Sequence, residues 1–275
     1  MRFLSLIPLL LLALLLPALA QQSDSIQDNS FLIEESYNQE PAVVQEISLF
    51  SWSNLTHSWV YTFTNEWPIN GLKHQFSYTI AATHAGGSPG MGLGDTALNY
   101  RYQLVGSGET RVAISPRLSL LIPSGDSRYA RGLGGTGLQT NLPLSLVLHP
   151  KLVTHFNAGA TWIPRAKNIL GDRAALTGYN VGQSFVYLAK PRFNLMLETV
   201  YNDMESVAAP GKTVRQKNLF VSPGIRWAYN FKSGLQIVPG IAAPLGVGPS
   251  SGDKGLIVYL SFEQPLKLLA WQKKD

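Results

Sequence analysis

The sequence contains no cysteine, few charged side chains and, after its first twenty residues, no long apolar run. Without cysteine the chain cannot be a small secreted domain held by disulfides, and it has no thiol for a lipid anchor. Only 14% of its residues are charged, and the net charge of +5 comes without basic clusters, which argues against nucleic acid as a partner. The lack of a second long apolar run excludes membrane-spanning helices. The five histidines lack the spacing of metal ligands, so neither a metal nor a cofactor is expected.

The first twenty residues have the pattern of a secretory signal peptide. Arg2 supplies a short positive region, an unbroken apolar run follows, and Ala18-Leu19-Ala20 matches a small-x-small cleavage site. We therefore expect residues 1–20 to be removed during export, the alternative being an uncleaved membrane anchor. An acidic segment, residues 21–42, would then open the mature chain on the periplasmic side.

From about residue 43 onward, polar and apolar side chains alternate with a period of two, which is typical of a β-strand with one wet and one oily face. Asn99 and Arg101, for example, interleave with Tyr100 and Tyr102. The pattern predicts about twelve strands, near residues 43–52, 57–66, 72–83, 93–105, 110–122, 138–149, 152–163, 177–190, 193–204, 216–230, 234–244 and 255–263. Strands of soluble proteins usually have about five or six residues, whereas a tilted strand needs about 9–11 to cross a bilayer.

The connections between these strands alternate in length. Short turns such as Pro150-Lys151 and Pro191-Arg192 alternate with long Gly-rich loops such as residues 123–137. Short turns at one end and long loops at the other, with an even strand count, predict an all-β fold, a transmembrane antiparallel β-barrel over residues 43–263. Residues 264–275 would form a periplasmic C-terminal tail. Ten or fourteen strands remain as alternatives, because the first and eighth strands alternate poorly.

The direction of the oily face separates a membrane barrel from a secreted β-sandwich. The five strands that alternate best carry no charge on their oily face, where a charge at mid-bilayer would cost about 2–4 kcal/mol. Large aromatic residues gather at the two ends of the strands: Trp52, Trp59, Trp162 and Tyr201 at the long-loop end, and Trp67, Tyr102, Tyr187, Trp227 and Tyr229 at the short-turn end. We therefore expect the oily face to meet lipid and the wet face to line the lumen. Bulges or breaks are expected where proline removes a ladder hydrogen bond, at Pro116, Pro143, Pro223 and Pro239.

A series of short motifs resembles a known family. The motifs are GLGD at 92–95 followed by Tyr100-Arg101-Tyr102, LIPSGD at 121–126, GLGGTG at 132–137, and the opening DNSFLIEESYNQEP at 28–41. They resemble the outer-membrane barrels of the meta-pathway phenol degradation family, a set of predicted transporters. The resemblance implies an outer-membrane channel for hydrophobic or aromatic nutrients. Such barrels usually end on an aromatic residue that the barrel assembly machinery reads, whereas here Phe262 is followed by a further tail.

Charged and polar residues on the wet faces are the candidate lumen lining. On this assignment they are Lys73, Asp95, Arg101, Arg111, Arg117, His155, Glu198 and Arg226. One interpretation is structural, with ion pairs that brace a polar interior; the other is a mildly cationic pore that favours anionic solutes. The acidic N-terminal segment complements these charges through Asp28, Glu34, Glu35 and Glu40. It is either a plug that docks into the lumen or a disordered tail.

Three functions follow from these patterns. The first is passive uptake of small, hydrophobic or aromatic solutes across an outer membrane, whose lipids surround the barrel. The second is a non-conducting barrel that is structural or presents its loops to partners. An outer-membrane lipid hydrolase comes third, because the pair Ser145 and His155 lies on the lumen side, away from lipid. The spacing of GLGGTG also fits a dinucleotide site, but the motif opens no helix and lacks the required context. The sequence leaves the oligomeric state open.

Overall fold

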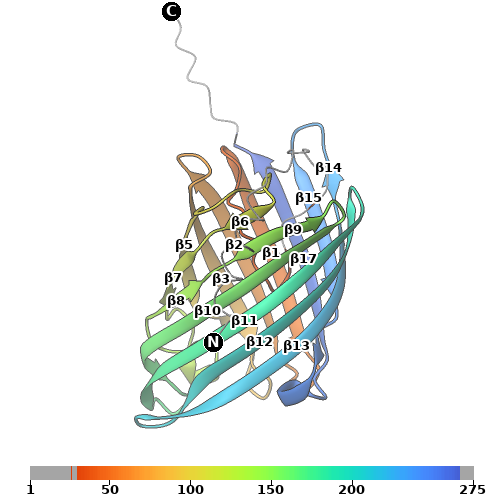
Figure 1. Cartoon of the computed structure of the whole chain (residues 1–275). Coiled ribbons are helices and arrows are strands. Elements are labelled where there is room, and N and C mark those ends of the chain that lie inside the picture. The colour runs from red at the N-terminus through yellow and green to blue at the C-terminus, as the bar shows by residue number, and fades with distance from the viewer. Residues whose placement is uncertain (1–25, 27–29, 267–275) are drawn as a thin grey trace, which may run out of the picture.

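The computed structural model describes residue 26 and residues 30–266. The expected signal peptide, Asp28 and the tail from residue 267 lie outside the described residues. The described chain forms one closed antiparallel barrel (Figure 1). Closure is direct, because β1 (Val43–Ser53) pairs with β2 (Trp59–Ile69) on one side and with β17 (Gly255–Pro265) on the other. Every backbone donor and acceptor of a closed sheet can find a partner within the wall, as a bilayer requires.

Seventeen strand segments build twelve spans of the wall, because five spans are split in two. The unsplit spans are β1, β2, β3 (His74–His84), β10 (Leu152–Lys167), β11 (Arg173–Lys190), β12 (Phe193–Ala209) and β17. The split spans are β4 (Gly92–Leu93) with β5 (Thr96–Tyr102), β6 (Val112–Ile114) with β7 (Arg117–Ile122), β8 (Gly137–Asn141) with β9 (Leu144–His149), β13 (Lys212–Trp227) with β14 (Tyr229–Asn230), and β15 (Gln236–Ala242) with β16 (Leu245–Gly246). Two short 3₁₀ turns, Ser127–Tyr129 and Gly248–Ser250, lie in loops. The predicted all-β barrel of twelve spans is confirmed.

Much of two connections that the sequence pattern left between strands, residues 164–176 and 205–215, is instead strand. β10 to β13 contain 16, 18, 17 and 16 residues and continue beyond their predicted ends (Figure 1). The turns that join them are tight because Gly171 and Gly211 adopt positive φ angles of 86° and 67°, which glycine accepts without steric cost. β17 also continues past residue 263, to Pro265.

The prolines act in two ways. Pro116 and Pro143 interrupt their own spans as predicted, between β6 and β7 and between β8 and β9. Pro223 and Pro239, by contrast, lie inside the continuous strands β13 and β15, so the expected break is absent there. Near Pro223 the neighbouring span is interrupted instead, and Ala243 there donates its N–H to the Pro223 carbonyl over 2.9 Å.

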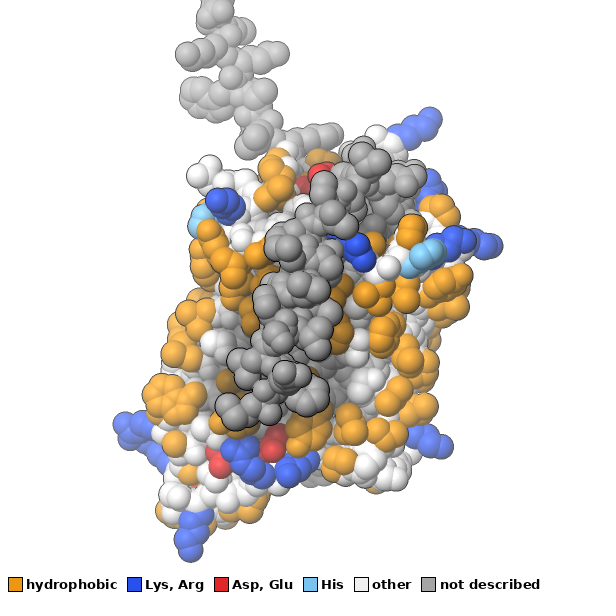
Figure 2. Space-filling model, viewed as in Figure 1, with side chains coloured by type: hydrophobic (Ala, Val, Ile, Leu, Met, Phe, Trp, Pro, Cys, Tyr) orange, Lys and Arg blue, Asp and Glu red, His pale blue; other side chains and the backbone are white. Residues whose placement is uncertain are grey.

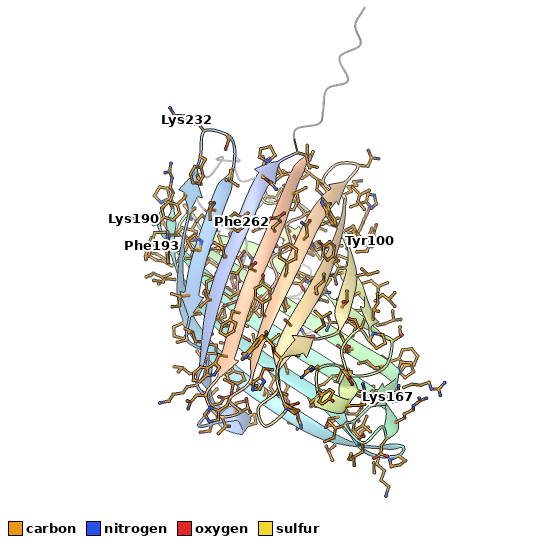
Figure 3. All side chains as sticks on the ribbon, turned by 180° about the vertical axis from the view of Figure 1, so that it is seen from behind. Tyr100, Lys167, Lys190, Phe193, Lys232 and Phe262 are labelled. Atoms are coloured by element: carbon orange, nitrogen blue, oxygen red, sulfur yellow. The ribbon has the colours of Figure 1, made fainter. Side chains whose placement is uncertain are left out.

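The oily faces point outward. Leu118 is 50% exposed, whereas Arg101 on the paired strand is 3% exposed. Apolar side chains cover the middle of the outer wall, and Lys and Arg gather toward its two ends (Figure 2). The labelled side chains give the same picture, with Lys190 and Lys232 at the short-turn end and Lys167 at the other (Figure 3). The predicted orientation of the side chains, apolar outside and polar inside, is confirmed. The described residues contain no helix with the length and apolar character to cross a membrane.

Candidate functional site: the occluded lumen

The N-terminal segment lies inside the barrel. We call residues 30–39 the inner segment; most of its residues are buried, although it belongs to no strand. Its backbone N–H groups are satisfied by side chains of the wall. Leu32 and Ile33 both donate to Glu198 Oε1, over 2.8 and 3.1 Å, and Glu34 donates to Asn157 Oδ1 over 2.8 Å.

The same arrangement continues across the lumen toward β1. The N–H of Ser36 donates to Ser145 Oγ, that of Asn38 to Gln103 Oε1, and that of Gln39 to Gln75 Oε1, over 2.9, 2.9 and 2.7 Å. The acceptors belong in turn to β12, β10, β9, the end of β5 and β3. The inner segment therefore crosses the lumen from β12 to β3.

The first half of the inner segment is anchored by apolar contact. The ring centre of Phe31 lies 5.1 Å from that of Tyr259 on β17. Glycine allows this close approach, because a Cβ on Gly240 would lie 2.5 Å from the Phe31 ring. Ile33 lies against Gly182 in the same way. Phe31 and Tyr259 belong to a buried apolar cluster that also includes Val153, Val186, Met196, Val238 and Ile257.

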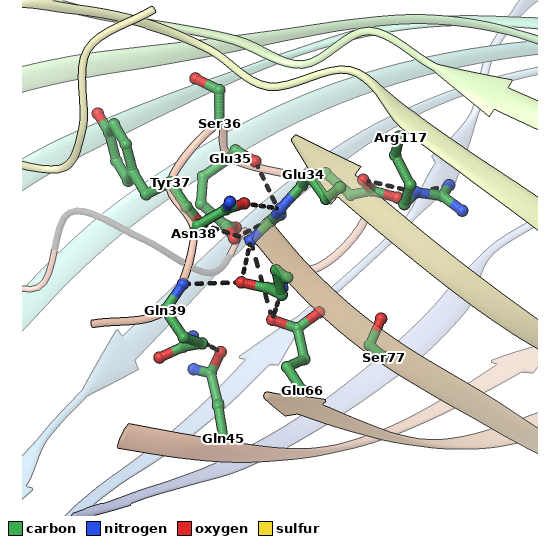
Figure 4. A network of polar contacts seen from close by, with 12 residues as sticks. Glu34, Glu35, Ser36, Tyr37, Asn38, Gln39, Gln45, Glu66, Ser77 and Arg117 are labelled. Carbon is green, nitrogen blue, oxygen red and sulfur yellow. Dashed lines mark hydrogen bonds and ion pairs between the residues drawn. The ribbon is translucent and has the colours of Figure 1, made fainter. Parts of the chain in front are cut away.

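The second half is held by charge (Figure 4). The guanidinium of Arg101 donates to Asn38 Oδ1 over 2.9 Å, and also to the Tyr37 carbonyl and the Glu35 side chain. A second carboxylate, that of Glu66, lies 3.9 Å from Arg101. Because both carboxylates and the guanidinium are nearly inaccessible to water, this cluster depends on its internal pairing.

Arg117 and Glu34 form the other ion pair of this half, with 2.7 Å between Nη2 and Oε1. Arg117 also donates to Asn99 Oδ1 over 3.1 Å and to Gln139 Oε1 over 3.2 Å. Burial raises the pKa of Glu34, but the positive charges of Arg117 and Arg101 outweigh it, so the pKa lies below its ordinary value. Glu34 is therefore ionised at neutral pH.

The residues predicted to line the lumen fall into two groups. Arg101, Arg117, His155, Glu198 and Arg226 lie on the lumen face of their strands. The remaining three lie elsewhere, namely Lys73, Asp95 and Arg111.

Lys73 and Arg111 are exposed in turns, because β3 begins only at His74 and β6 only at Val112. Asp95 lies in the break between β4 and β5. Its carboxylate accepts the N–H groups of Gly125 and Leu133, over 3.1 and 2.7 Å, and thereby fixes the long loop after β7.

The acidic residues of the predicted plug also differ from one another. Glu34 and Glu35 lie within the lumen and pair with Arg117 and Arg101. Glu40 is exposed just before β1, and its carbonyl accepts the N–H of Val43 over 3.0 Å. Of the described acidic residues of this segment, Glu34 and Glu35 therefore contact the lumen charges and Glu40 does not.

Several residues that hold the inner segment were not singled out from the sequence. They are Glu66 and the amides Gln75, Gln103 and Asn157. The alternating pattern could have assigned two of them to the lumen, because Gln75 shares a strand face with Ser77 and Asn157 shares one with His155. A lumen-facing amide without an obvious partner in the wall indicates a ligand or a chain segment inside.

The pair considered for hydrolysis is also part of this arrangement. Ser145 Oγ and His155 Nδ1 are 2.7 Å apart, and both side chains are buried. Ser145 accepts the N–H of Ser36, and the ring of Tyr37 meets that of His155 edge-on at 5.9 Å. The pair thus braces the inner segment rather than facing lipid. Among the described residues no group of three or more His, Asp or Glu could hold a metal ion.

Comparisons with known proteins identify the fold. An outer membrane channel from Pseudomonas putida F1 superposes with a TM-score of 0.60 at 11% identity, over 86% of this chain and 98% of that one. The NanC porin superposes with a TM-score of 0.53 at 10% identity, over 79% of this chain and 98% of that one. No family model and no curated protein matches the chain, so membership of the phenol degradation family stays a prediction. The fold is that of an outer-membrane porin.

Proposed function

We propose that the protein is an outer-membrane channel for small solutes, closed in this conformation by the inner segment. The observation that carries the proposal is the way the segment is held. Each hydrogen bond named above between segment and wall has a side chain at one end, so the segment can leave without breaking the strand pairing of the barrel. A plug needs this property, whereas a structural strand would be joined to the wall by its backbone.

The solute class that best fits the barrel is small and apolar or aromatic. Ile163, Ala166 and Leu176 form a buried apolar cluster near the long-loop ends of β10 and β11. Leu133, in the loop that Asp95 fixes, packs against this cluster. The cluster is fully buried, so it stabilises the wall at the long-loop end and does not itself line a path for the solute. The resemblance of the sequence motifs points to the same class.

Removal of the segment tests the channel directly. Residues 30–39 are deleted, and in a matched variant they are replaced by a Gly/Ser stretch of the same length. Both variants should raise single-channel conductance in planar bilayers and the rate of liposome swelling above those of the full chain. Unchanged conductance in both variants contradicts the plug.

A non-conducting barrel is the rival, and one observation favours it. The side chains of His155, Glu198 and Arg226 have no exposed surface, so the lumen is well filled. The swelling assay separates the two functions, because a solid barrel stays impermeable even after the segment is removed.

A further inference from the structure

The strands β10 to β13 reach beyond the apolar band of the wall at the long-loop end, which is the lower end in Figure 1. β11 contains 18 residues and is about 59 Å long at about 3.3 Å per residue. At a tilt of about 40° it covers about 45 Å of height, whereas the apolar band of an outer-membrane barrel is about 25 Å tall. Tyr187, in the girdle at the short-turn end, lies close to the end of β11, so the excess length falls on the long-loop side.

The outward side chains of β11 change from aromatic to charged along this extension. Arg173, Thr177 and Tyr179 face outward, since the residues that alternate with them are buried. Trp162, the register partner of Thr177, belongs to the predicted girdle. Aromatic side chains at this level mark the boundary between acyl chains and headgroups. Arg173 lies about 13 Å farther along the strand than Thr177, and therefore at the level of the headgroups.

A groove of about 270 Å³ lies in the outer wall at the girdle. The large side chains of Leu138, Trp162 and Tyr179 border it, and between them lie the small register partners Thr140 and Ala160. Trp162 and Tyr179 are 50% and 55% exposed, so they stand out from the wall beside the recess. The hydroxyl of Thr140 already donates to the Ala160 carbonyl, over 3.4 Å. An apolar chain can therefore fill the groove without stripping this polar group of its partner.

Arg215 on β13 fixes one side of the groove. Its guanidinium carbon lies 5.6 Å from the centre of the Tyr179 ring, and its Nη2 donates to the Thr177 hydroxyl over 2.9 Å. The carboxylates of Asp203 and Glu205 hold the guanidinium in this place, at 2.8 and 3.8 Å. The charge of Arg215 is balanced by these two partners, so its role is to position the Tyr179 ring beside the groove.

Three further cations on this outer surface lack such partners. Lys167 and Arg173 are register partners beyond the groove, and Lys167 points away from the barrel at this end (Figure 3). Lys217 lies on β13, on the same face as Arg215. Within the part of the chain that the structure describes, none of these three cations forms an ion pair. Cations therefore outnumber carboxylates on the outer face of β10 to β13 beyond the girdle.

The groove and the unpaired cations together fit one class of ligand. A lipid with an anionic headgroup places its acyl chains at the level of the groove and its charges at the level of the cations. Inorganic phosphate would use the cations but leave the recess empty. If the barrel lies in an outer membrane with its long loops outside, this surface faces the outer leaflet. The anionic lipid of that leaflet is lipopolysaccharide, which carries phosphates on its acylated sugars.

We propose that this outer surface binds one molecule of lipopolysaccharide, with an acyl chain in the groove between Trp162 and Tyr179 and with its phosphates on Lys167, Arg173 and Lys217. The site goes beyond the proposed function and rests on it only for the end of the barrel that faces the outer leaflet. The bound lipid ties the long hairpins of β10 to β13 to that leaflet, and this accounts for charged side chains on strands that continue past the girdle.

Native mass spectrometry of the full chain in detergent tests the site, because it counts bound lipid molecules. The probe is lipid A that carries two phosphates, and the comparison probes are lipid A without phosphate and phosphatidylglycerol. The chain should bind one molecule of the phosphorylated lipid A, and binding should weaken as the salt concentration rises. Both comparison probes should bind at least about tenfold more weakly, because one lacks the phosphates and the other offers a single phosphate.

Two variants separate the parts of the site. Lys167→Gln, Arg173→Gln and Lys217→Gln in one chain remove the unpaired cations and should weaken binding by about a hundredfold at low ionic strength. Ala160→Leu fills the groove while every charge stays, and it should reduce the fraction of chain with bound lipid A. These side chains all face outward, so the strand pairing of the barrel is left intact. Heat-modifiable migration checks that each variant is folded.

The matched control is Lys190→Gln with Lys232→Gln, which removes cations at the short-turn end and should leave binding unchanged (Figure 3). The site is overturned if the full chain binds no lipid A, if phosphatidylglycerol binds as tightly, or if the control variant loses as much affinity as the other two. Conductance after removal of residues 30–39 reports the proposed function separately. A chain that binds lipid A but never conducts would lose the channel and keep the site.

Discussion

The two halves of the inner segment are fixed by different physical means. Phe31 and Ile33 lie against glycines of β11 and β15, in contacts that are apolar and insensitive to pH or salt. Glu34 and Glu35 are held by Arg117 and Arg101, in contacts that depend on ionisation and on the exclusion of water. The first half also depends on one carboxylate, because Leu32 and Ile33 donate their N–H groups to Glu198, whereas the second half depends on two ion pairs.

The two halves of the inner segment face different strands of the wall. The apolar half faces β11, β13, β15 and β17, and the charged half faces β3 to β9, where three spans are split. Two split spans, β13 with β14 and β15 with β16, lie beside the apolar half, so interruptions of the wall occur beside both halves of the inner segment. An opening that begins with Glu34 and Glu35 would leave Phe31 in place, so the segment would move about its anchor and stay within the barrel.

The largest effect is expected from Arg101→Met. This substitution leaves the carboxylates of Glu35 and Glu66 buried without their cation. Removing one partner of a buried ion pair costs about 3–5 kcal/mol. The variant should release the charged half, raise the open fraction in planar bilayers, and lower the urea concentration at which the barrel unfolds.

Two controls sharpen this test. Arg101→Lys keeps the charge but lacks the planar fork that reaches Asn38 and Tyr37, so its effect should be intermediate. Arg128→Met removes an exposed arginine that pairs only locally with Asp126, and it should leave conductance unchanged. Equal conductance of the chain with arginine or methionine at position 101 would contradict an electrostatic hold.

A smaller effect, on the other half, is expected from Gly240→Ala. The added Cβ would lie 2.5 Å from the Phe31 ring, and overpacking of this kind costs about 1–3 kcal/mol. The anchor should loosen, while the pairing of Arg101 stays intact. Noise in the closed-state current measures this loosening.

Shortening Phe31 to leucine in the same chain should restore the quiet closed state, because the smaller side chain frees the space. Gly108→Ala is the control, since its nearest neighbour would be 3.7 Å away, an ordinary contact. A double variant as noisy as Gly240→Ala alone would show that the glycine acts through another neighbour.

The barrel could be predicted from the sequence because its signal is local. Alternation assigns Leu118 to lipid and Arg117 to the lumen from their positions in the strand alone, and the proline in each of two spans marks its break. The lengths of β10 to β13 could not be predicted, because a polar stretch with one turn glycine is interpreted as a loop whether or not the strands around it continue to pair.

The candidate site could be predicted only in part, because its contacts are set by closure of the barrel. The acidic character of the N-terminal segment pointed to Glu34 and Glu35, but nothing local assigns Glu35 to Arg101 rather than to Arg226. Gln75 and Gln103 look like any polar residue on a wet face. Their role is recognised only in the folded barrel, where they accept hydrogen bonds from the inner segment. That segment shows no alternating pattern from which its position could be predicted.

The smallest effect concerns pH. The pKa of Glu34 is lowered when it is docked, by Arg117 and Arg101 and against burial, so docking is strengthened by this group above its ordinary pKa. As pH falls from the ordinary pKa through the lowered one, that contribution of Glu34 is lost, and the open fraction should rise in this acid window. Glu34→Gln should raise the open fraction slightly at neutral pH and reduce the acid response, because glutamine cannot be protonated there.

Arg117 keeps Asn99 and Gln139 as acceptors in this variant, so the barrel itself should stay intact. If Glu34→Gln kept the full rise in open fraction at acid pH, the response would belong to the cluster of Arg101, Glu35 and Glu66. The ion pair of Arg101 would then break at a higher pH than that of Arg117.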